Sequence, residues 1–254
     1  MDLHQLLKDL PKGLDGTTIN PECINTLQHL IQESYGNDAN PRVLERFRSK
    51  KNVVLHLSIP DSDHEFVTKI FVTEAFEKEV KILQDSFEHG LSVPEVINAR
   101  DDVLLMSYIP GPPLVDVINQ SFSPSLMKDL AEWYFFFHSV HGQIKGDPRL
   151  RNFIYNTHGI FGVDFEETRQ DHWILDIAGI AASIFDTNPI FDKRKHTLAW
   201  NLLEAYLDLR HSKRDPAINH LFIKTIADTL RETAELRNDS RIYNIADTIE
   251  NDGF

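Results

Sequence analysis

Residues 145–152, which read KGDPRLRN, combine a carboxylate, an amide and several cations in a short polar stretch. Asp147 stands five residues before Asn152, and Asp164 follows twelve residues later. Phosphoryl transfer from ATP needs a carboxylate that orients the acceptor hydroxyl, oxygen ligands for Mg²⁺, and a cation that balances the developing charge. Asp147 could be the base and Asn152 and Asp164 the metal ligands. Arg149 could then face the transferred phosphate.

Regular apolar patterns surround these polar residues. Two short strands are expected at 153–155 and 160–163, joined by the turn residues 156–159. Ser123 and Pro124 are a typical N-cap and first position of a helix that precedes the polar stretch. Further helices are predicted at about 171–186, 192–211, 215–236 and 240–250. This part of the chain should therefore be mainly helical.

The N-terminal half has a different pattern. Strands are predicted at 42–48, 53–59, 65–72, 93–99 and 103–108, and one helix at about 73–88. Residues 1–40 look helical and loosely tied to the rest. A Pro/Gly-rich stretch at 109–113 separates the halves. The expected fold is α+β and two-lobed, with a helical extension (1–40), a β-rich lobe (41–109) that has an antiparallel sheet and one helix, and an α-rich lobe (110–254).

The order of motifs resembles a known superfamily. Asp147-x4-Asn152, then an apolar strand and Asp164-Phe165, resembles the catalytic and metal-binding loops of protein kinases. Gly146 before Asp147, and Glu166 where protein kinases have glycine, are closer to the compact branch. That branch includes aminoglycoside and choline phosphotransferases, lipopolysaccharide-core kinases and the small archaeal-type kinase of the tRNA threonylcarbamoylation complex. The resemblance covers roughly residues 42–190 and implies ATP with Mg²⁺ or Mn²⁺ as cofactors.

The same resemblance implies roles for residues outside the polar stretch. Lys69, late in the strand 65–72, would contact the ATP phosphates and pair with Glu79 of the following helix, with Glu77 as the alternative partner. Residues 104–111 look like the linker that binds adenine through backbone groups, around Ser107 and Ile109. Asp176 would brace the backbone of the polar stretch.

Some positions depart from the family pattern. The loop that would cover the phosphates, residues 47–52, contains no glycine, although Ser49 and Lys50 could contact phosphate there. Without glycine, close approach of the backbone to phosphate is harder. Position 145 is lysine, where the family mostly has histidine. Only eleven residues separate Asp164 from Asp176, too few for a long activation segment.

Composition excludes several other classes of protein. The 254 residues carry a net charge of −13, so a broad surface for nucleic acid or anionic membrane is not expected. Local basic clusters at 42–51 and 145–151 could still face phosphate. The single cysteine, Cys23, cannot form an internal disulfide, and the N-terminus lacks the pattern of a secretory signal, which favours the cytoplasm. No apolar run is long enough to span a bilayer.

Three functions fit these observations. The first is an active kinase whose hydroxyl acceptor is a small molecule, a sugar or lipid-linked glycan, or a protein serine or threonine. The second is a pseudokinase that binds nucleotide or a partner without turnover. The third, which rests on the resemblance and the basic clusters, is a scaffold in a tRNA-modifying assembly. His138 and His141 share one helix face, but no third ligand accompanies them, so packing is expected rather than metal binding. The identity of the acceptor and the oligomeric state stay open.

Overall fold

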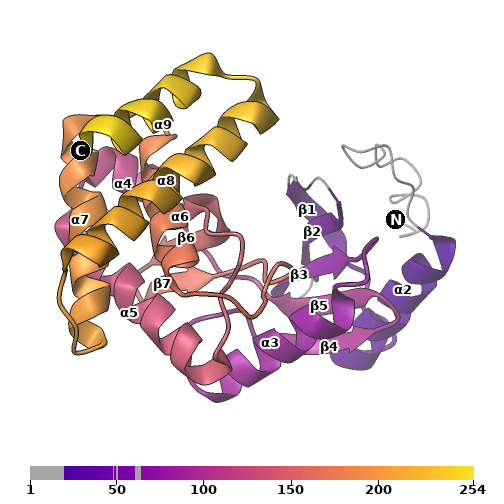
Figure 1. The fold of residues 1–254 in the computed structure, drawn as a ribbon. Coiled ribbons are helices and arrows are strands. Elements are labelled where there is room, and N and C mark those ends of the chain that lie inside the picture. The colour runs from indigo at the N-terminus through magenta and orange to yellow at the C-terminus, as the bar shows by residue number, and fades with distance from the viewer. Residues whose placement is uncertain (1–19, 48, 50, 61–63) are drawn as a thin grey trace. The chain divides into compact units, whose positions relative to one another are not determined.

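The computed structural model describes residues 20–47, 49, 51–60 and 64–254, which form two compact units. The first unit comprises Met1–Glu88 and Val93–Ile109, and the second comprises His89–Ser92 and Pro110–Phe254. In the first unit lie α2 (Pro21–Tyr35), β1 (Arg42–Phe47), β2 (Val53–Ser58), β3 (Glu65–Ile70), α3 (Phe76–Glu88), β4 (Val96–Arg100) and β5 (Val103–Ser107) (Figure 1).

The second unit is mainly helical (Figure 1). Its elements are α4 (Leu114–Ser121), α5 (Pro124–His141), the 3₁₀ turn η1 (Leu150–Asn152), β6 (Phe153–Asn156), β7 (Gly159–Gly162), α6 (Ile174–Phe185), α7 (Lys193–Leu209), α8 (Pro216–Arg237) and α9 (Ser240–Asp252). An antiparallel sheet with one inserted helix followed by a helical part is the α+β class that the sequence predicts. That prediction of the fold class is confirmed.

The sheet of the first unit is antiparallel, with the strand order β1-β2-β3-β5-β4. Alternation of side chains along the strands separates its two faces. Leu55, Phe66 and Ile70 belong to a core that also contains α2 side chains. Lys69 has the opposite parity on β3 and pairs with a residue of α3. The two helices therefore cover opposite faces of the sheet.

Helix α2 corrects one expectation, that residues 1–40 are loosely tied. Asn20 caps the helix by accepting a hydrogen bond from the Glu22 backbone N–H at 3.1 Å. Leu27 and Ile31 are almost completely buried in the core of the first unit. Residues 21–35 are thus an integral part of that core, because their apolar stripe fills one face of the sheet. Residues 1–19 lie outside the described part of the chain.

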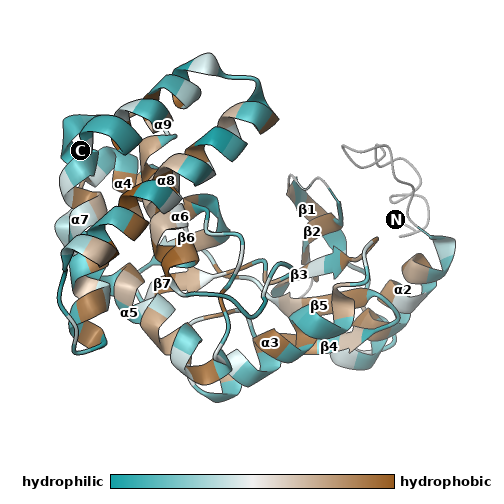
Figure 2. Ribbon diagram, in the orientation of Figure 1, coloured by the Kyte–Doolittle hydropathy of each residue, from teal (hydrophilic) through white to brown (hydrophobic). Residues whose placement is uncertain are grey.

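The aromatic run at 133–137 forms part of the core of the second unit, as predicted. The Trp133 ring stacks on Phe137 with centroids 5.5 Å apart and meets Phe153 of β6 edge-on at 5.0 Å. Helix α6 is buried along most of its length. Figure 2 shows α8 and α9 with mixed polar and apolar residues, typical of helices with one exposed face. The short helix α4 was not predicted.

Helix length and polarity bear on membrane insertion. Among the residues that the structure describes, no helix combines the length and apolar character needed to cross a membrane.

Candidate catalytic loop and nucleotide-contacting residues

The polar stretch 145–152, called the catalytic loop below, lies between α5 and β6 in the second unit and includes η1. The Asn152 side-chain nitrogen donates to the Asp147 carboxylate at 2.9 Å and to the Asp147 backbone oxygen at 3.1 Å. The Arg149 Nε lies 2.9 Å from the other Asp147 carboxylate oxygen. Three residues that the sequence singles out are therefore in direct contact. These bonds fix the orientation of the Asp147 carboxylate.

Asp176, at the start of α6, holds the backbone of the catalytic loop. Its carboxylate accepts hydrogen bonds from the backbone N–H groups of Lys145 at 2.6 Å and Gly146 at 3.0 Å. Nε2 of His138 lies 3.0 Å from the same carboxylate, and Nδ1 of that ring lies 2.7 Å from the Tyr206 hydroxyl. The bracing predicted for Asp176 is confirmed, and His138 is a partly buried residue with a hydrogen-bonding partner at each ring nitrogen.

Two glycines allow the loop to adopt this path. Gly146 has φ +85°, in the left-handed region, and a Cβ there would lie 2.1 Å from the backbone oxygen of Glu167. Gly179 of α6 packs against Pro148, where a Cβ would lie 2.2 Å from the ring. The loop therefore lies between the 165–169 segment and α6, with no room for a methyl group at either contact.

Asp164 lies two residues after the end of β7, with Val163 between them. Its φ of +64° is in the left-handed region, uncommon for a residue other than glycine. The buried Lys145 ammonium donates to the Asp164 backbone oxygen at 2.6 Å and lies 5.1 Å from the Phe165 ring centroid. Lys145, which stands where the resembled family mostly has histidine, thus ties the catalytic loop to the segment that carries Asp164.

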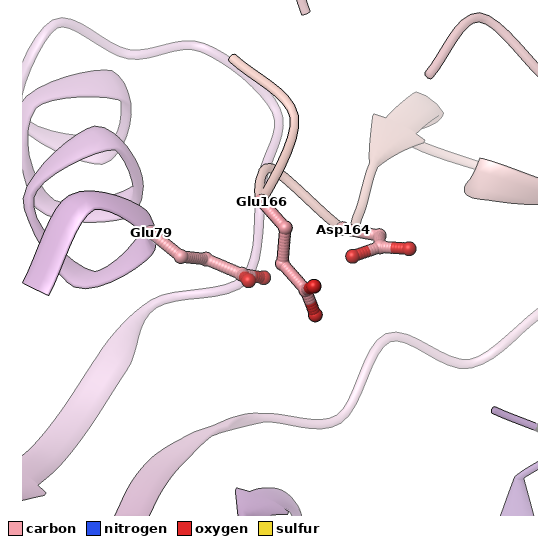
Figure 3. A group of neighbouring side chains, drawn as sticks. All are labelled: Glu79, Asp164 and Glu166. Atoms are coloured by element: carbon pink, nitrogen blue, oxygen red, sulfur yellow. The ribbon is translucent and has the colours of Figure 1, made fainter. Parts of the chain in front are cut away.

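Glu166 is a further carboxylate that the sequence analysis did not select as a metal ligand. A carboxylate oxygen of Glu166 lies within 4.8 Å of one of Asp164. Figure 3 shows both side chains projecting from the segment after β7. The only sequence signal was its place two residues after Asp164. Carboxylates at this spacing often have no metal role, so the sequence alone gave no reason to choose it.

In the first unit, Lys69 of β3 pairs with Glu79 of α3. The Lys69 Nζ lies 2.7 Å from a Glu79 carboxylate oxygen, and both side chains are at most 5% exposed. Figure 3 shows Glu79 projecting from α3. Glu77 is exposed on the same helix. The structure thus contains the predicted pair and favours Glu79 over the alternative Glu77.

The sequence predicts nucleotide contacts for four further residues, and the structure describes the surroundings of three of them. The Ser49 hydroxyl accepts a hydrogen bond from the Asn52 backbone N–H at 3.1 Å, which closes a local turn. The Ser107 hydroxyl accepts one from the Glu95 backbone N–H at 2.9 Å and so ties two strand ends together. Ile109 ends the first unit just after β5. Lys50 lies outside the described residues.

Comparisons with known proteins agree with this architecture. The family model of the RIO domain matches residues 44–166, slightly less than half of the chain. No curated relative matches the sequence. The matched segment includes the Lys69–Glu79 pair and the catalytic loop.

Several solved structures share the fold over most of their length. An amicoumacin kinase in complex with AMP-PNP, Ca²⁺ and Ami has a TM-score of 0.60 and 13% identity, with 91% of this chain and 93% of that chain covered. A choline/ethanolamine kinase family protein from Mesorhizobium loti has a TM-score of 0.62 and 11% identity, with 89% of this chain and 94% of that chain covered. An ethanolamine kinase from Plasmodium vivax has a TM-score of 0.60 and 11% identity, with 89% of this chain and 83% of that chain covered. At these identities the likeness concerns the fold, which is the compact protein-kinase-like fold that the sequence motifs predict.

Proposed function

We propose that this chain transfers the γ-phosphoryl group of ATP, with Mg²⁺ or Mn²⁺, to a hydroxyl group of a small molecule. The observation that carries the proposal is the hydrogen-bonded catalytic loop, in which Asn152 orients Asp147 and Asp176 fixes the backbone. Small-molecule kinases among the similar structures support a small acceptor over a protein. The single cysteine, Cys23, also favours a reducing compartment, the cytoplasm.

The proposed reaction needs one base near the acceptor. The acceptor hydroxyl would give its proton to the Asp147 carboxylate while its oxygen bonds to the γ-phosphorus. The bond from phosphorus to the β,γ-bridging oxygen breaks, and ADP leaves. Arg149, which is paired with Asp147, is the residue we propose to contact the transferred phosphoryl group, and this pairing supports that role.

The side chains of the second unit fit a divalent cation. The amide nitrogen of Asn152 faces Asp147, so its amide oxygen is the atom left to coordinate a metal. Asp164 supplies a carboxylate, with Glu166 close to it. Hard oxygen ligands of this kind suit Mg²⁺, which would offset the negative charge of the phosphates. In the first unit, Lys69 is held by Glu79 and is the candidate phosphate ligand.

A second candidate function is nucleotide binding without turnover. It is favoured by the segment 47–52, which contains no glycine and in which the Ser49 hydroxyl is already engaged by the Asn52 backbone. Such a loop offers fewer amides to phosphate than a glycine-rich loop does. The intact set of Asp147, Asn152 and Asp164 favours the enzyme.

Thermal unfolding with nucleotides tests the proposal. A ligand at a hundredfold excess over its Kd raises the free energy of unfolding by about 2.7 kcal/mol. We expect ATP with Mg²⁺ to raise the Tm, ATP with EDTA to raise it less, and labelled phosphate to appear on an acceptor from a panel of hydroxyl compounds. Binding without transfer to any acceptor would favour the second candidate. No rise in Tm with any nucleotide–metal pair at millimolar concentrations would contradict both.

A further inference from the structure

Four cations of the second unit act electrostatically on one buried carboxylate, Asp186, which directly contacts Arg237. These four cations, called the basic cluster below, are Arg149 of the catalytic loop, Arg151 of η1, Lys195 of α7 and Arg237 at the end of α8. All four lower the pKa of Asp186, which burial raises. The cluster therefore brings three distant segments of the sequence to one place.

Direct contacts fix most members of the basic cluster. An Arg237 nitrogen lies 2.7 Å from the Asp186 carboxylate, whose side chain is 7% exposed. The buried Lys195 ammonium donates to the Thr187 backbone oxygen at 2.6 Å and to its hydroxyl at 3.1 Å. Arg149 is engaged by Asp147. These three cations are held in position by groups of the chain itself.

Arg151 differs from the other three. Within the described part of the chain it has no hydrogen-bonding side-chain partner and no ion pair. Its side chain is exposed, and the positive charges of Arg149 and Arg237 and the negative charges of Asp147 and Asp164 act on it. An exposed guanidinium that two other guanidinium groups repel is stabilised by an anion.

Asp186 does not neutralise the basic cluster. One of its carboxylate oxygens is buried without a hydrogen-bond partner in the described part of the chain, and the other meets Arg237. Asp147, Asp164 and Asp186 together supply three negative charges against four positive ones. This excess stands out on a chain whose net charge is −13, since most of its surface should repel anions.

We infer that the acceptor carries an anionic group, a phosphate or a carboxylate, beside the hydroxyl that receives the phosphoryl group, and that Arg151 and Arg237 bind it. The inference rests on the proposed function. Choline and ethanolamine, which the names of two similar structures mention, are cations. Such acceptors would be repelled by the basic cluster. The charge of the acceptor should therefore differ between those proteins and this chain.

Matched acceptors test the inference. Glycerol, glycerol 3-phosphate, glycerate and ethanolamine differ mainly in charge, and transfer from labelled ATP would be measured for each. We expect the two anionic compounds to have higher kcat/KM than glycerol, and ethanolamine the lowest. Preference for the phosphate or the carboxylate would identify the anion. A higher kcat/KM for glycerol or ethanolamine would overturn the inference and leave the kinase proposal intact.

Arg151→Gln is the informative variant because it breaks no ion pair of the folded chain. We expect it to raise KM for the anionic acceptor about tenfold or more, with KM for ATP unchanged. The control Lys224→Gln removes an exposed cation elsewhere on α8 and should change neither value. An increase in KM for ATP alone would assign Arg151 to the nucleotide and overturn the inference.

Binding can be measured even if none of these compounds accepts phosphate. Inorganic phosphate and glycerate would be titrated while the arginine Nε–H signals are followed by NMR. We expect saturable shifts at Arg151 and Arg237, absent at Arg151 in the Arg151→Gln protein. No saturable shift at millimolar concentrations would overturn the inference, whereas absence of a Tm shift with Mg·ATP would separately contradict the kinase proposal.

Discussion

The ammonium group of Lys145 lies 2.6 Å from the backbone oxygen of Asp164, and the lysine is completely buried. This contact joins the catalytic loop to the segment that carries a candidate metal ligand. Lys145→Met would keep much of the side-chain volume but leave the carbonyl without this donor. We expect the free energy of unfolding to fall by about 1–3 kcal/mol and Mg·ATP affinity to weaken.

Chemical denaturation and calorimetry would measure both effects. Lys128→Met is a suitable control, because Lys128 lies on α5 of the same unit with a side chain that is 72% exposed. If Lys145→Met matched this control in both measurements, Lys145 would have no role in holding Asp164.

The Lys69–Glu79 pair should respond strongly to removal of one partner. Both side chains are nearly inaccessible, so Lys69→Ala leaves a buried carboxylate without its cation. We expect each single alanine variant to lose about 3–5 kcal/mol of stability.

The double variant separates the pair from its surroundings. Lys69→Ala with Glu79→Ala should cost less than the sum of the singles, with a coupling of about 0.5–3 kcal/mol. Lys69→Ala with Glu77→Ala should be additive, because Glu77 is exposed. Equal coupling in the two double variants would rule out Glu79 as the specific partner.

Gly146→Ala should disturb the catalytic loop, because its φ is +85° and the new Cβ would lie 2.1 Å from the Glu167 backbone oxygen. We expect a lower Tm and loss of most phosphoryl transfer, since Asp147 is the next residue. The control is Gly142→Ala, with φ +60° but no atom within 4 Å of the added carbon. Similar losses in both variants would indicate backbone strain alone, without a role for the contact with Glu167.

Stability should depend on pH through Lys195. Burial lowers its pKa from 10.5 to about 8, against the opposing effect of Asp186. Between these values the unfolded chain binds more protons than the folded chain, so the free energy of unfolding should rise with pH through this window and fall as pH is lowered. We expect the stability difference between the parent and Lys195→Met to shift in favour of the parent from pH 8 to pH 10.5. Parallel pH profiles of the two proteins would contradict this.

Local patterns predicted most of the fold. The strands at 53–58 and 65–70 are rich in apolar and β-branched residues. Asp215 with Pro216 predicted the start of α8, where the Asp215 carboxylate accepts a hydrogen bond from the Ile218 backbone N–H at 2.8 Å. Helix α4 was missed because its eight residues follow two prolines and are too short for a clear period. The packing of α2 was missed because its Gly and Pro neighbours suggested a mobile extension.

The candidate site, like the fold, could be predicted from the sequence only in part. Asp147, Asn152 and Asp164 could be selected as candidates because they lie within one short region of sequence. Arg237 and Asp186 were not, because they are 51 residues apart and meet only when α8 folds back beside the end of α6. The engaged hydroxyls of Ser49 and Ser107 were also unpredictable, since residue type does not show which backbone N–H a side chain will meet.

Asp147→Asn compared with Asp164→Asn tests the central proposal most directly. Asp147→Asn keeps the size of the side chain but loses the anionic base, so kcat should fall steeply with Mg·ATP affinity nearly unchanged. Asp164→Asn should weaken Mg·ATP binding as well, because it removes charge from the proposed metal ligand. The measurement is Mg·ATP affinity by calorimetry together with phosphoryl transfer for both variants and the parent. An Asp147→Asn protein as active as the parent would contradict the assigned catalytic centre.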